Sequence, residues 1–392
     1  MLSFGKVPLS GTLLAPPQLL KDEATYPLDV VFCSRCSLLQ LIQTVSPSTM
    51  YDWTVYRDPP PPSMQERIEA RQLAERLIAE RRLGPDSLVV EIASGEGALL
   101  REFQARHVSV LGIEPASGPA NRAREAGVPT LAAFFSRDLA QYLKSEDKRG
   151  DVVIARDVLA RVPDLHGFLG GIRTLLKDEG IALIEVPYVR ELVDQNAFDA
   201  LNDEQLCYFS LSALVDALEA ADLWPGRVEL TGPDRGMLRL HVAAVPGEMS
   251  PAHEYVKAEA YAGVGSASYY RGFGERAAET RAQLRTLLGG LRREGKRIVA
   301  YGASSAGTTL LNFAGLDHEY VDFVVDEDTQ RQGRFVPGVH LPVLSPESLL
   351  SDIPDFLLLL DRSGEDSLQA VRPALKTGGT RFIVPTPTPI VI

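Results

Sequence analysis

The chain has 392 residues, of which 45% are hydrophobic and 23% charged, and its formal net charge at pH 7 is −12. A chain of this length is too long for one ordinary core, so two or three domains are expected. The acidic excess argues against a protein that binds nucleic acid irrespective of sequence, because neutralising phosphates takes a surplus of Lys and Arg on one face. One small anionic ligand stays compatible with this charge.

Targeting signals are not evident. The first residues lack the charged-then-apolar pattern of a signal peptide, and no stretch approaches the roughly 20 apolar residues that span a bilayer. We therefore expect a cytoplasmic protein without a membrane partner. The three cysteines, Cys33, Cys36 and Cys207, are too few for a disulfide framework.

A small N-terminal unit comes first. Four consecutive prolines at 59–62 stiffen the backbone and remove amide donors, which is typical of a connector, so the first domain is predicted over residues 1–58. A helix is predicted over 63–84, where Ser63 can cap the N-terminus and apolar residues recur along one stripe.

From residue 87, short β-branched runs alternate with amphipathic stretches. This alternation is typical of parallel strands joined by crossover helices, so a Rossmann-like α/β domain is predicted over residues 63–246. His241 is expected to be a sheet residue rather than a catalyst. The predicted strands lie at 87–93, 108–114, 151–158, 180–188 and 237–245.

A third unit follows a polar stretch rich in Gly and Ala. Residues 270–297 predict one long helix, and buried strands then alternate again with helical segments. We expect a second, smaller parallel sheet in a C-terminal Rossmann-like domain over residues 265–392. Its predicted strands lie at 297–303, 320–327, 355–361 and 380–385.

The stretch "SLVVEIASGEGALL" predicts a cofactor-binding turn. The strand ends at Glu91, and the small residues that follow let backbone amides approach a ligand at a helix N-terminus. The next strand ends about 20 residues downstream in Glu114, where a carboxylate can accept both hydroxyls of a ribose. The three-glycine dinucleotide pattern is absent, which favours S-adenosylmethionine; a tight turn without a ligand is the alternative. The turn comprises Ala93, Ser94, Gly95 and Gly97.

Two further positions belong to this predicted cofactor site. Phe134 lies in the segment that usually flanks adenine, and its ring is equally compatible with stacking and with core packing. Asp157 follows the strand at 151–158, at the sheet edge where α/β proteins bind ligands, although plain solvation is as consistent with its position.

Over nearly its whole length the chain resembles the nucleotide-sugar C-methyltransferases of deoxysugar and antibiotic pathways. The resemblance is carried by "LGPDSLVVEIASGEGALL", "VLGIEPA", "DVLARVPDL", "EVPY", "FDALNDEQLCYFSL", "YGASSAGTTLLN" and "QGRFVPGVHLPV". It implies a small zinc-binding N-terminal module, a central domain that binds S-adenosylmethionine, and a C-terminal Rossmann-like domain that helps to enclose the sugar nucleotide. It also implies that a base removes the proton beside the ketone of a thymidine-diphosphate sugar, and that the enolate attacks the sulfonium methyl.

The expected catalytic segment departs from this family. The family typically has tyrosine, histidine, glutamate and histidine there, the last being the usual candidate base. A glutamine amide cannot take a proton from carbon, so the resemblance leaves Glu204 or Asp203 as base if burial raises its pKa. Two solvated loop acids are the alternative. The four residues of this chain are Asn202, Asp203, Glu204 and Gln205.

Other candidates surround this segment. Tyr188 follows the strand at 180–188, where its phenol can bond a keto oxygen or enolate, or simply pack at the strand end. A family histidine is replaced by Arg161, and a family lysine by Ala306. Ser304 and Ser305 open a helix after a strand, which suits a diphosphate. The predicted substrate-binding residues are Asn202, Gln205, Asp234, Arg235, Ser304 and Ser305.

The zinc module implied by the resemblance is incomplete. The family uses two CxxC pairs, whereas this chain begins after the point where the first would lie and has only Cys33 and Cys36. Two thiolates do not complete a tetrahedral site, so a bound zinc ion is not expected.

Two classes of function follow. The first is an S-adenosylmethionine-dependent C-methyltransferase acting on a nucleotide-linked keto-deoxysugar or a related ketone. The second is a relative that no longer methylates, either an isomerase or reductase or a cofactor-bound partner protein, because function resides in the site and not in the fold.

Overall fold

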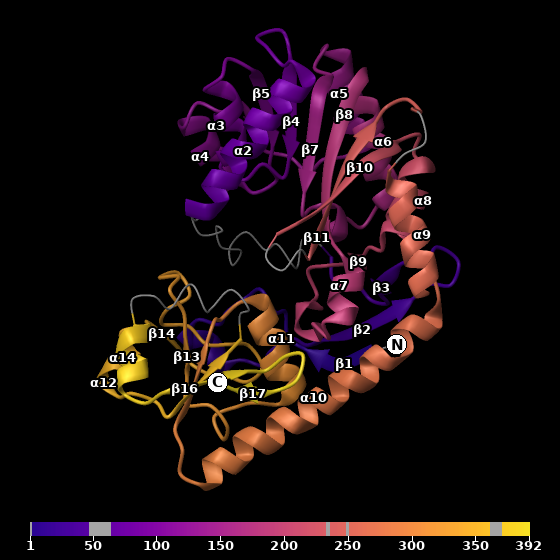
Figure 1. The fold of residues 1–392 in the computed structure, drawn as a ribbon. Helices are drawn as coiled ribbons and strands as arrows, with labels where there is room; N and C mark the ends of the chain where they lie inside the picture. The colour runs from indigo at the N-terminus through magenta and orange to yellow at the C-terminus, as the bar shows by residue number, and fades with distance from the viewer. Residues whose placement is uncertain (1, 47–63, 233–235, 248–250, 361–370) are drawn as a thin grey trace.

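The structure, a computed structural model, describes the chain as three sheets with flanking helices (Figure 1). In Figure 1 the strands at the indigo N-terminal end lie between the central sheet and the orange-to-yellow C-terminal part. None of the helices within the described ranges is long and apolar enough to cross a bilayer. The described residues are 2–46, 64–232, 236–247, 251–360 and 371–392.

The N-terminal sheet is antiparallel and has the strand order β1-β2-β3-β9. Its last strand comes from the segment that follows the predicted catalytic residues, since Leu39 pairs with Tyr208 and Gln40 with Cys207. This pairing draws that segment against the N-terminal part of the chain. The elements are β1 (Leu2–Val7), η1 (Pro16–Leu20), β2 (Tyr26–Phe32), β3 (Leu39–Leu41) and β9 (Cys207–Tyr208).

The central sheet has the order β10-β11-β8-β7-β4-β5-β6, and its strands are parallel from β8 to β6. The order reverses between β4 and β7, which is the point where doubly wound folds bind their ligands. β10 and β11 add an antiparallel edge. The strands are β4 (Leu88–Ile92), β5 (Ser109–Ile113), β6 (Thr130–Leu131), β7 (Gly150–Arg156), β8 (Leu176–Pro187), β10 (Trp224–Thr231) and β11 (Met237–Ala243).

Helices cover both faces of the central sheet. Apolar residues of α2, α3 and α4 pack on one face, and those of α5, α6 and α8 pack on the other. The strands are therefore buried on both sides, which explains their continuous β-branched runs. The elements are α2 (Met64–Arg81), α3 (Ala98–Gln104), α4 (Ser117–Glu125), α5 (Arg137–Ser145), η2 (Leu159–Arg161), α6 (Leu165–Leu175), α7 (Val189–Asp194), η3 (Phe198–Ala200) and α8 (Leu211–Glu219).

The C-terminal sheet has the order β14-β13-β12-β15-β16-β17 and is parallel except for β17. The long helix α10 leads into it along the lower edge of Figure 1. The elements are α9 (Ala252–Ala262), α10 (Ala267–Arg293), β12 (Ile298–Tyr301), α11 (Ser305–Ala314), β13 (Val324–Val325), β14 (Val343–Leu344), α12 (Ser348–Ser351), β15 (Phe356–Leu359), α14 (Arg372–Thr377), β16 (Arg381–Val384) and β17 (Ile390–Val391).

The N-terminal and C-terminal sheets share one apolar core through α10 and α11. The ring of Phe313 on α11 lies 4.8 Å from that of Phe4 on β1 and 5.2 Å from that of Phe198 on η3, measured between centroids. The N-terminal strands are thus packed against the C-terminal part of the chain.

Several elements differ from the sequence prediction. The helix α9 was not predicted, and neither were the short strands β14 and β17. The helix α10 begins three residues earlier than predicted and ends at Arg293, before a Gly-containing turn. The predicted helix cap Ser63 and the proline connector lie outside the described residues.

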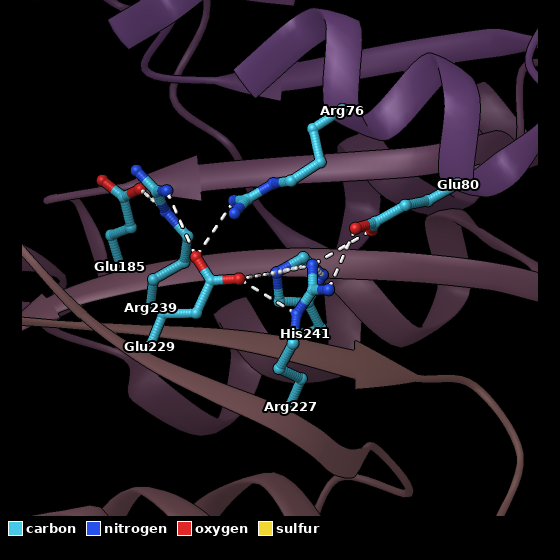
Figure 2. Close-up of polar contacts among 7 residues, drawn as sticks. All are labelled: Arg76, Glu80, Glu185, Arg227, Glu229, Arg239 and His241. Carbon is cyan, nitrogen blue, oxygen red and sulfur yellow. Dashed lines mark hydrogen bonds and ion pairs between the residues drawn. The ribbon is translucent and has the colours of Figure 1, made fainter. Parts of the chain in front are cut away.

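Charged side chains form a cross-strand network on the face of the central sheet that α2 covers. In register, Arg156 of β7 lies opposite Glu185 of β8, which lies opposite Arg239 of β11. Arg239 in turn lies opposite Glu229 of β10. Glu229 also pairs with Arg76 of α2, with N–O at 3.0 Å. Figure 2 shows the part of the network from Glu185 to Arg76, which ties α2 to the antiparallel edge.

His241 completes this network beside Arg227. Burial and the nearby Arg227 charge lower the pKa of His241 to about 4, so the ring is neutral at pH 7. Its Nε2 accepts from the Arg227 guanidinium at 3.0 Å, because arginine can only donate. Arg227 also forms two 3.0 Å contacts with Glu80 of α2 (Figure 2).

We expect Glu229→Gln to lower the free energy of unfolding by about 3 kcal/mol, because it leaves the half-buried guanidinium groups of the network without their shared carboxylate. Urea denaturation measures the change. Asp178→Asn is the matched control: its partner Arg149 lies at 3.2 Å on the surface, and the loss there is expected to stay within about 1 kcal/mol. Equal losses in the two variants would show that the network adds no stability.

Candidate active site

The turn after β4 folds the chain back on β5. Ala93 has a φ of 57° and donates its N–H to the carbonyl of Ile113 at 2.8 Å. Gly95 and Gly97 also have positive φ, 53° and 73°. A Cβ on Gly97 would lie 3.0 Å from a methyl of Val128. The turn therefore requires small residues, and it holds the backbone close to the carboxyl edge of the sheet.

Glu114 closes this turn from the end of β5. Its Oε2 accepts from the N–H of Gly95 at 2.8 Å, and its Oε1 accepts from the N–H of Ala116 at 2.8 Å. Burial raises the pKa of Glu114, and the two backbone bonds oppose that rise. Each carboxylate oxygen retains a lone pair, so Glu114 can accept from the hydroxyls of a ribose.

Glu91 and Asp157 stand at the ends of β4 and β7, where the strand order reverses. Oε1 of Glu91 lies 3.2 Å from a guanidinium nitrogen of Arg156. Burial raises the pKa of Glu91 to about 7, although Arg156 lowers it. Within the described residues, Oε2 of Glu91, Oγ of Ser94 and Oδ1 of Asp157 are buried without a hydrogen-bond partner. Because buried polar atoms are normally paired, this clustering indicates that the edge binds a polar ligand.

Phe134 and Phe135 follow β6 and point to different surroundings. Phe135 packs edge-on against Phe168, with centroids 5.1 Å apart and planes at 78°, so it belongs to the core. Phe134 is 56% exposed. Stacking of Phe134 on adenine stays a prediction.

The predicted catalytic segment forms a tight turn against the N-terminal part of the chain. Oδ1 of Asn202 accepts from the N–H of Glu204 at 3.0 Å, and Oδ1 of Asp203 accepts from the N–H of Ser10 at 2.8 Å. The hydroxyl of Tyr208 accepts from the N–H of Asn202 at 2.9 Å. Burial raises the pKa of Asp203, opposed by the bond to Ser10. Asp203 therefore anchors the turn.

Glu204 lies where all three parts of the chain meet. Its Oε2 accepts from Arg161 at 2.7 Å, and the same guanidinium donates to Oδ2 of Asp157 at 3.0 Å. The hydroxyl of Ser305, from the C-terminal part, lies 3.5 Å from Oε1 of Glu204. A Cβ on Gly11, from the N-terminal part, would overlap that same oxygen. Arg161 thus connects Glu204 to the end of β7.

Tyr188 has its own polar partners, Glu259 and Arg190. Burial and hydrogen bonding to Glu259 of α9 raise the pKa of its phenol, while Arg190 lowers it. Glu259 is fully buried and also accepts from the N–H groups of Leu211 and Ser212 at 2.7 and 2.8 Å. Tyr188 therefore anchors α9, and it takes no part in the mechanism proposed below.

The predicted substrate residues have mixed surroundings. The hydroxyl of Ser304 accepts from the N–H of Gly307 at 3.2 Å and caps α11. Gln205 is half-buried next to Glu204. Asp234 and Arg235 lie outside the described residues.

Sequence reasoning did not place three residues of the site. Arg161 was noted as a departure from the family histidine, which was the available signal for its role. Gly11 and Ser10 gave no local signal, because their contacts with Glu204 and Asp203 join opposite ends of the sequence.

The cysteines do not assemble a structural zinc site in the part of the chain that the structure describes, where no group of three or more His, Cys, Asp or Glu side chains could hold a metal. Cys33 and Cys36 lie on one tight turn, in which the N–H of Ser37 donates to the carbonyl of Cys33 at 2.9 Å. Backbone N–H groups of Cys36 and Arg35 lower the pKa of Cys33. Two thiols supply half of a tetrahedral set.

Comparisons with known proteins agree with this architecture. Three family models match the chain: "Putative zinc binding domain" at residues 1–51, "Methyltransferase domain" at 64–224 and "C-methyltransferase C-terminal domain" at 236–387. The C-methyltransferase NovU of Streptomyces niveus is 33% identical over 396 residues, which cover 100% of this chain and 94% of NovU.

Similar solved structures include two methyltransferases. CcbJ of Streptomyces caelestis is 15% identical, with a TM-score of 0.38 over 51% of this chain and 96% of CcbJ. An S-adenosylmethionine-dependent methyltransferase of Clostridium acetobutylicum is 9% identical, with a TM-score of 0.37 over 46% of this chain and 92% of that protein.

The matching family models and the similarity to NovU define an S-adenosylmethionine-dependent methyltransferase, and the reversal of strand order agrees with that class. Its acceptor atom is carbon. Because the similarity to NovU covers the whole of this chain, the chain belongs to the C-methyltransferase family that includes NovU.

The titration of Glu91 gives a pH-dependent prediction. Because its folded pKa of about 7 exceeds the ordinary 4.5, the folded protein binds more protons in this range, and Glu91 costs stability as pH rises from 4.5 to 7. We expect the free energy of unfolding of Glu91→Gln to rise by roughly 3 kcal/mol relative to that of wild type as pH rises across this window. Urea denaturation without cofactor measures this difference. A difference between the two proteins that does not change with pH would contradict the raised pKa.

Gly11→Ala tests the junction. The added methyl must displace the Glu204 carboxylate, so we expect methyl transfer to slow about 100-fold while the affinity for S-adenosylhomocysteine stays unchanged. Label transfer and calorimetry measure the two effects. Gly84→Ala is the matched control, because a Cβ there meets no atom within 4 Å. Unchanged transfer in Gly11→Ala would place the reaction away from Glu204.

Proposed function

We propose that the chain methylates a carbon beside the ketone of a keto-deoxysugar carried on thymidine diphosphate, in natural-product biosynthesis, with Glu204 as the base. The observation that carries the proposal is the Arg161 bridge, which joins Glu204 to Asp157 at the ligand-binding edge of the central sheet. Relationship to a C-methyltransferase supports the reaction type. Resemblance to the sugar-nucleotide enzymes supports the substrate class.

Glu204 has the chemistry that the first step needs. Its carboxylate takes the proton from the carbon beside the ketone, and the electrons of that C–H bond move to the ketone oxygen as an enolate. Bound S-adenosylmethionine supplies the methyl group, which leaves its sulfur for the enolate carbon. Gln205, at the position of the family base, can donate its amide hydrogens but cannot remove a proton from carbon.

Arg161 has two roles in this proposal. It holds the Glu204 carboxylate at a set position, since its other nitrogens are bonded to Asp157. As a permanent cation beside the reacting carbon it also stabilises the negative charge that develops on the enolate oxygen. A histidine at this position, as in the family, would not be a permanent cation at neutral pH.

The cofactor and substrate contacts divide between the sheets. We assign the ribose to Glu114, the turn at Ser94 and Gly95 to the cofactor backbone contacts, and Phe134 to the adenine. We assign the sugar nucleotide to the C-terminal side, where Ser305 and Gln205 adjoin Glu204.

We expect Glu204→Gln to lower methyl transfer by at least about 1,000-fold with unchanged affinity for S-adenosylhomocysteine, because an amide of the same shape cannot accept the proton. The assay incubates methyl-labelled cofactor with a panel of nucleotide keto-sugars and follows label and mass. Exchange of the substrate C–H with deuterated solvent is a second readout, and it should also disappear.

Glu102→Gln is the matched control, since Glu102 pairs with the half-buried Arg106 at 2.9 Å and has no place in the proposed site, so this variant should keep full activity. Retained exchange in Glu204→Gln would move the base elsewhere, with Asp203 tested next. Cofactor binding without methylation of any ketone in the panel would exclude the proposed substrate class.

A further inference from the structure

The pair formed by the buried Glu91 and the half-buried Arg156 is unlike the other ion pairs of the sheet. Glu91 is 3% exposed, yet its contact with Arg156 is a single one, at 3.2 Å. Arg156 is the last residue of β7. In the β4–β7 register Glu91 lies opposite Ile154, two residues before Arg156, so the guanidinium reaches Glu91 from the carboxyl end of the strand. Both groups stand at the reversal of strand order, where this fold binds ligands.

The pair is not fully satisfied by the described residues. Oε2 of Glu91 and Nε of Arg156 are both buried without a hydrogen-bond partner. Leaving buried charged groups incompletely bonded costs more than leaving neutral ones, so the pair is expected to have other partners in the working state. Ser94 and Asp157, on the two neighbouring turns, each add one unpartnered buried oxygen.

The amino-acid end of S-adenosylmethionine has the complementary charges. It carries an α-ammonium and an α-carboxylate on one carbon, and a carboxylate facing a guanidinium is the matching arrangement. We propose that Glu91 binds the α-ammonium of the cofactor and Arg156 its α-carboxylate. The role of Arg156 is the new part of this proposal. It depends on the identity of the cofactor and not on that of the sugar substrate.

The position of the ribose contact agrees with this assignment. Glu114 bonds the N–H of Gly95, so the turn that begins after Glu91 lies between the two acids. A nucleoside held by Glu114 on the β5 side would have its amino-acid end across the turn, toward β4 and β7. The charged side chains at those two strand ends are Glu91, Arg156 and Asp157, of which Arg156 is the cation.

A structural role for Arg156 is the competing explanation. Arg156 lies opposite Glu185, the acid that Arg239 also bonds, so it forms the first position of the cross-strand network. In that case its removal would loosen the sheet and weaken every ligand of the site equally. Ligands with and without the amino-acid end can therefore distinguish a cofactor contact from a structural role of Arg156.

The experiment compares two ligands by calorimetry. S-adenosylhomocysteine has the amino-acid end, and methylthioadenosine has the nucleoside and sulfur without it. We expect Arg156→Gln to weaken binding of S-adenosylhomocysteine by about 10- to 100-fold and to change binding of methylthioadenosine by less than about 2-fold. Arg156→Lys keeps the charge without the planar fork and should lie between wild type and Arg156→Gln. Arg149→Gln, on the surface, should change neither ligand.

Two results would overturn the proposal. Equal weakening of both ligands, together with a lower melting temperature, would assign Arg156 to the network alone. Unchanged binding of S-adenosylhomocysteine would remove it from the cofactor site. If Arg156→Gln does not fold, wild-type protein decides: decarboxylated S-adenosylmethionine should bind at least about 10-fold more weakly than the intact cofactor, and equal affinities would refute the contact.

Discussion

The guanidinium of Arg161 is the interaction on which the candidate site depends. It bonds Glu204 and Asp157 at once, and so connects the catalytic segment to the end of a strand in the cofactor-binding sheet. Without it, Glu204 would be a loop acid held by its neighbours alone. Because the segment is also bound to the N-terminal part through Asp203 and Ser10, it is held both by that part and by the end of β7.

The central sheet places two kinds of charge on one face. Towards β10 and β11, Glu185, Arg239 and Glu229 are bonded to one another, and the resulting network fastens α2. Towards β4, Glu91 and Arg156 have buried atoms without partners. The first arrangement stabilises the fold, whereas the second costs stability in the absence of a ligand, which is a common property of binding sites.

Most of the regular structure followed from local pattern. The strands β4, β5, β7 and β8 were predicted because burial on both faces demands continuous β-branched runs, a strong signal within a few residues. The helix α9 was missed because a buried glutamate and two surface tyrosines weaken its apolar stripe. The strand β9 has two residues, and it exists because Leu39 and Gln40 present an edge to it.

The sequence by itself predicted the two α/β parts, the tight turn after β4 and the position of the acid Glu114, since each depends on residues close together along the chain. It also showed that the family base was absent. Only the tertiary structure shows that Glu204 lies beside Gly11, Arg161 and Ser305, and these contacts are why we propose it as the base. Contacts between such distant segments depend on how the sheets pack, and no local pattern records that packing.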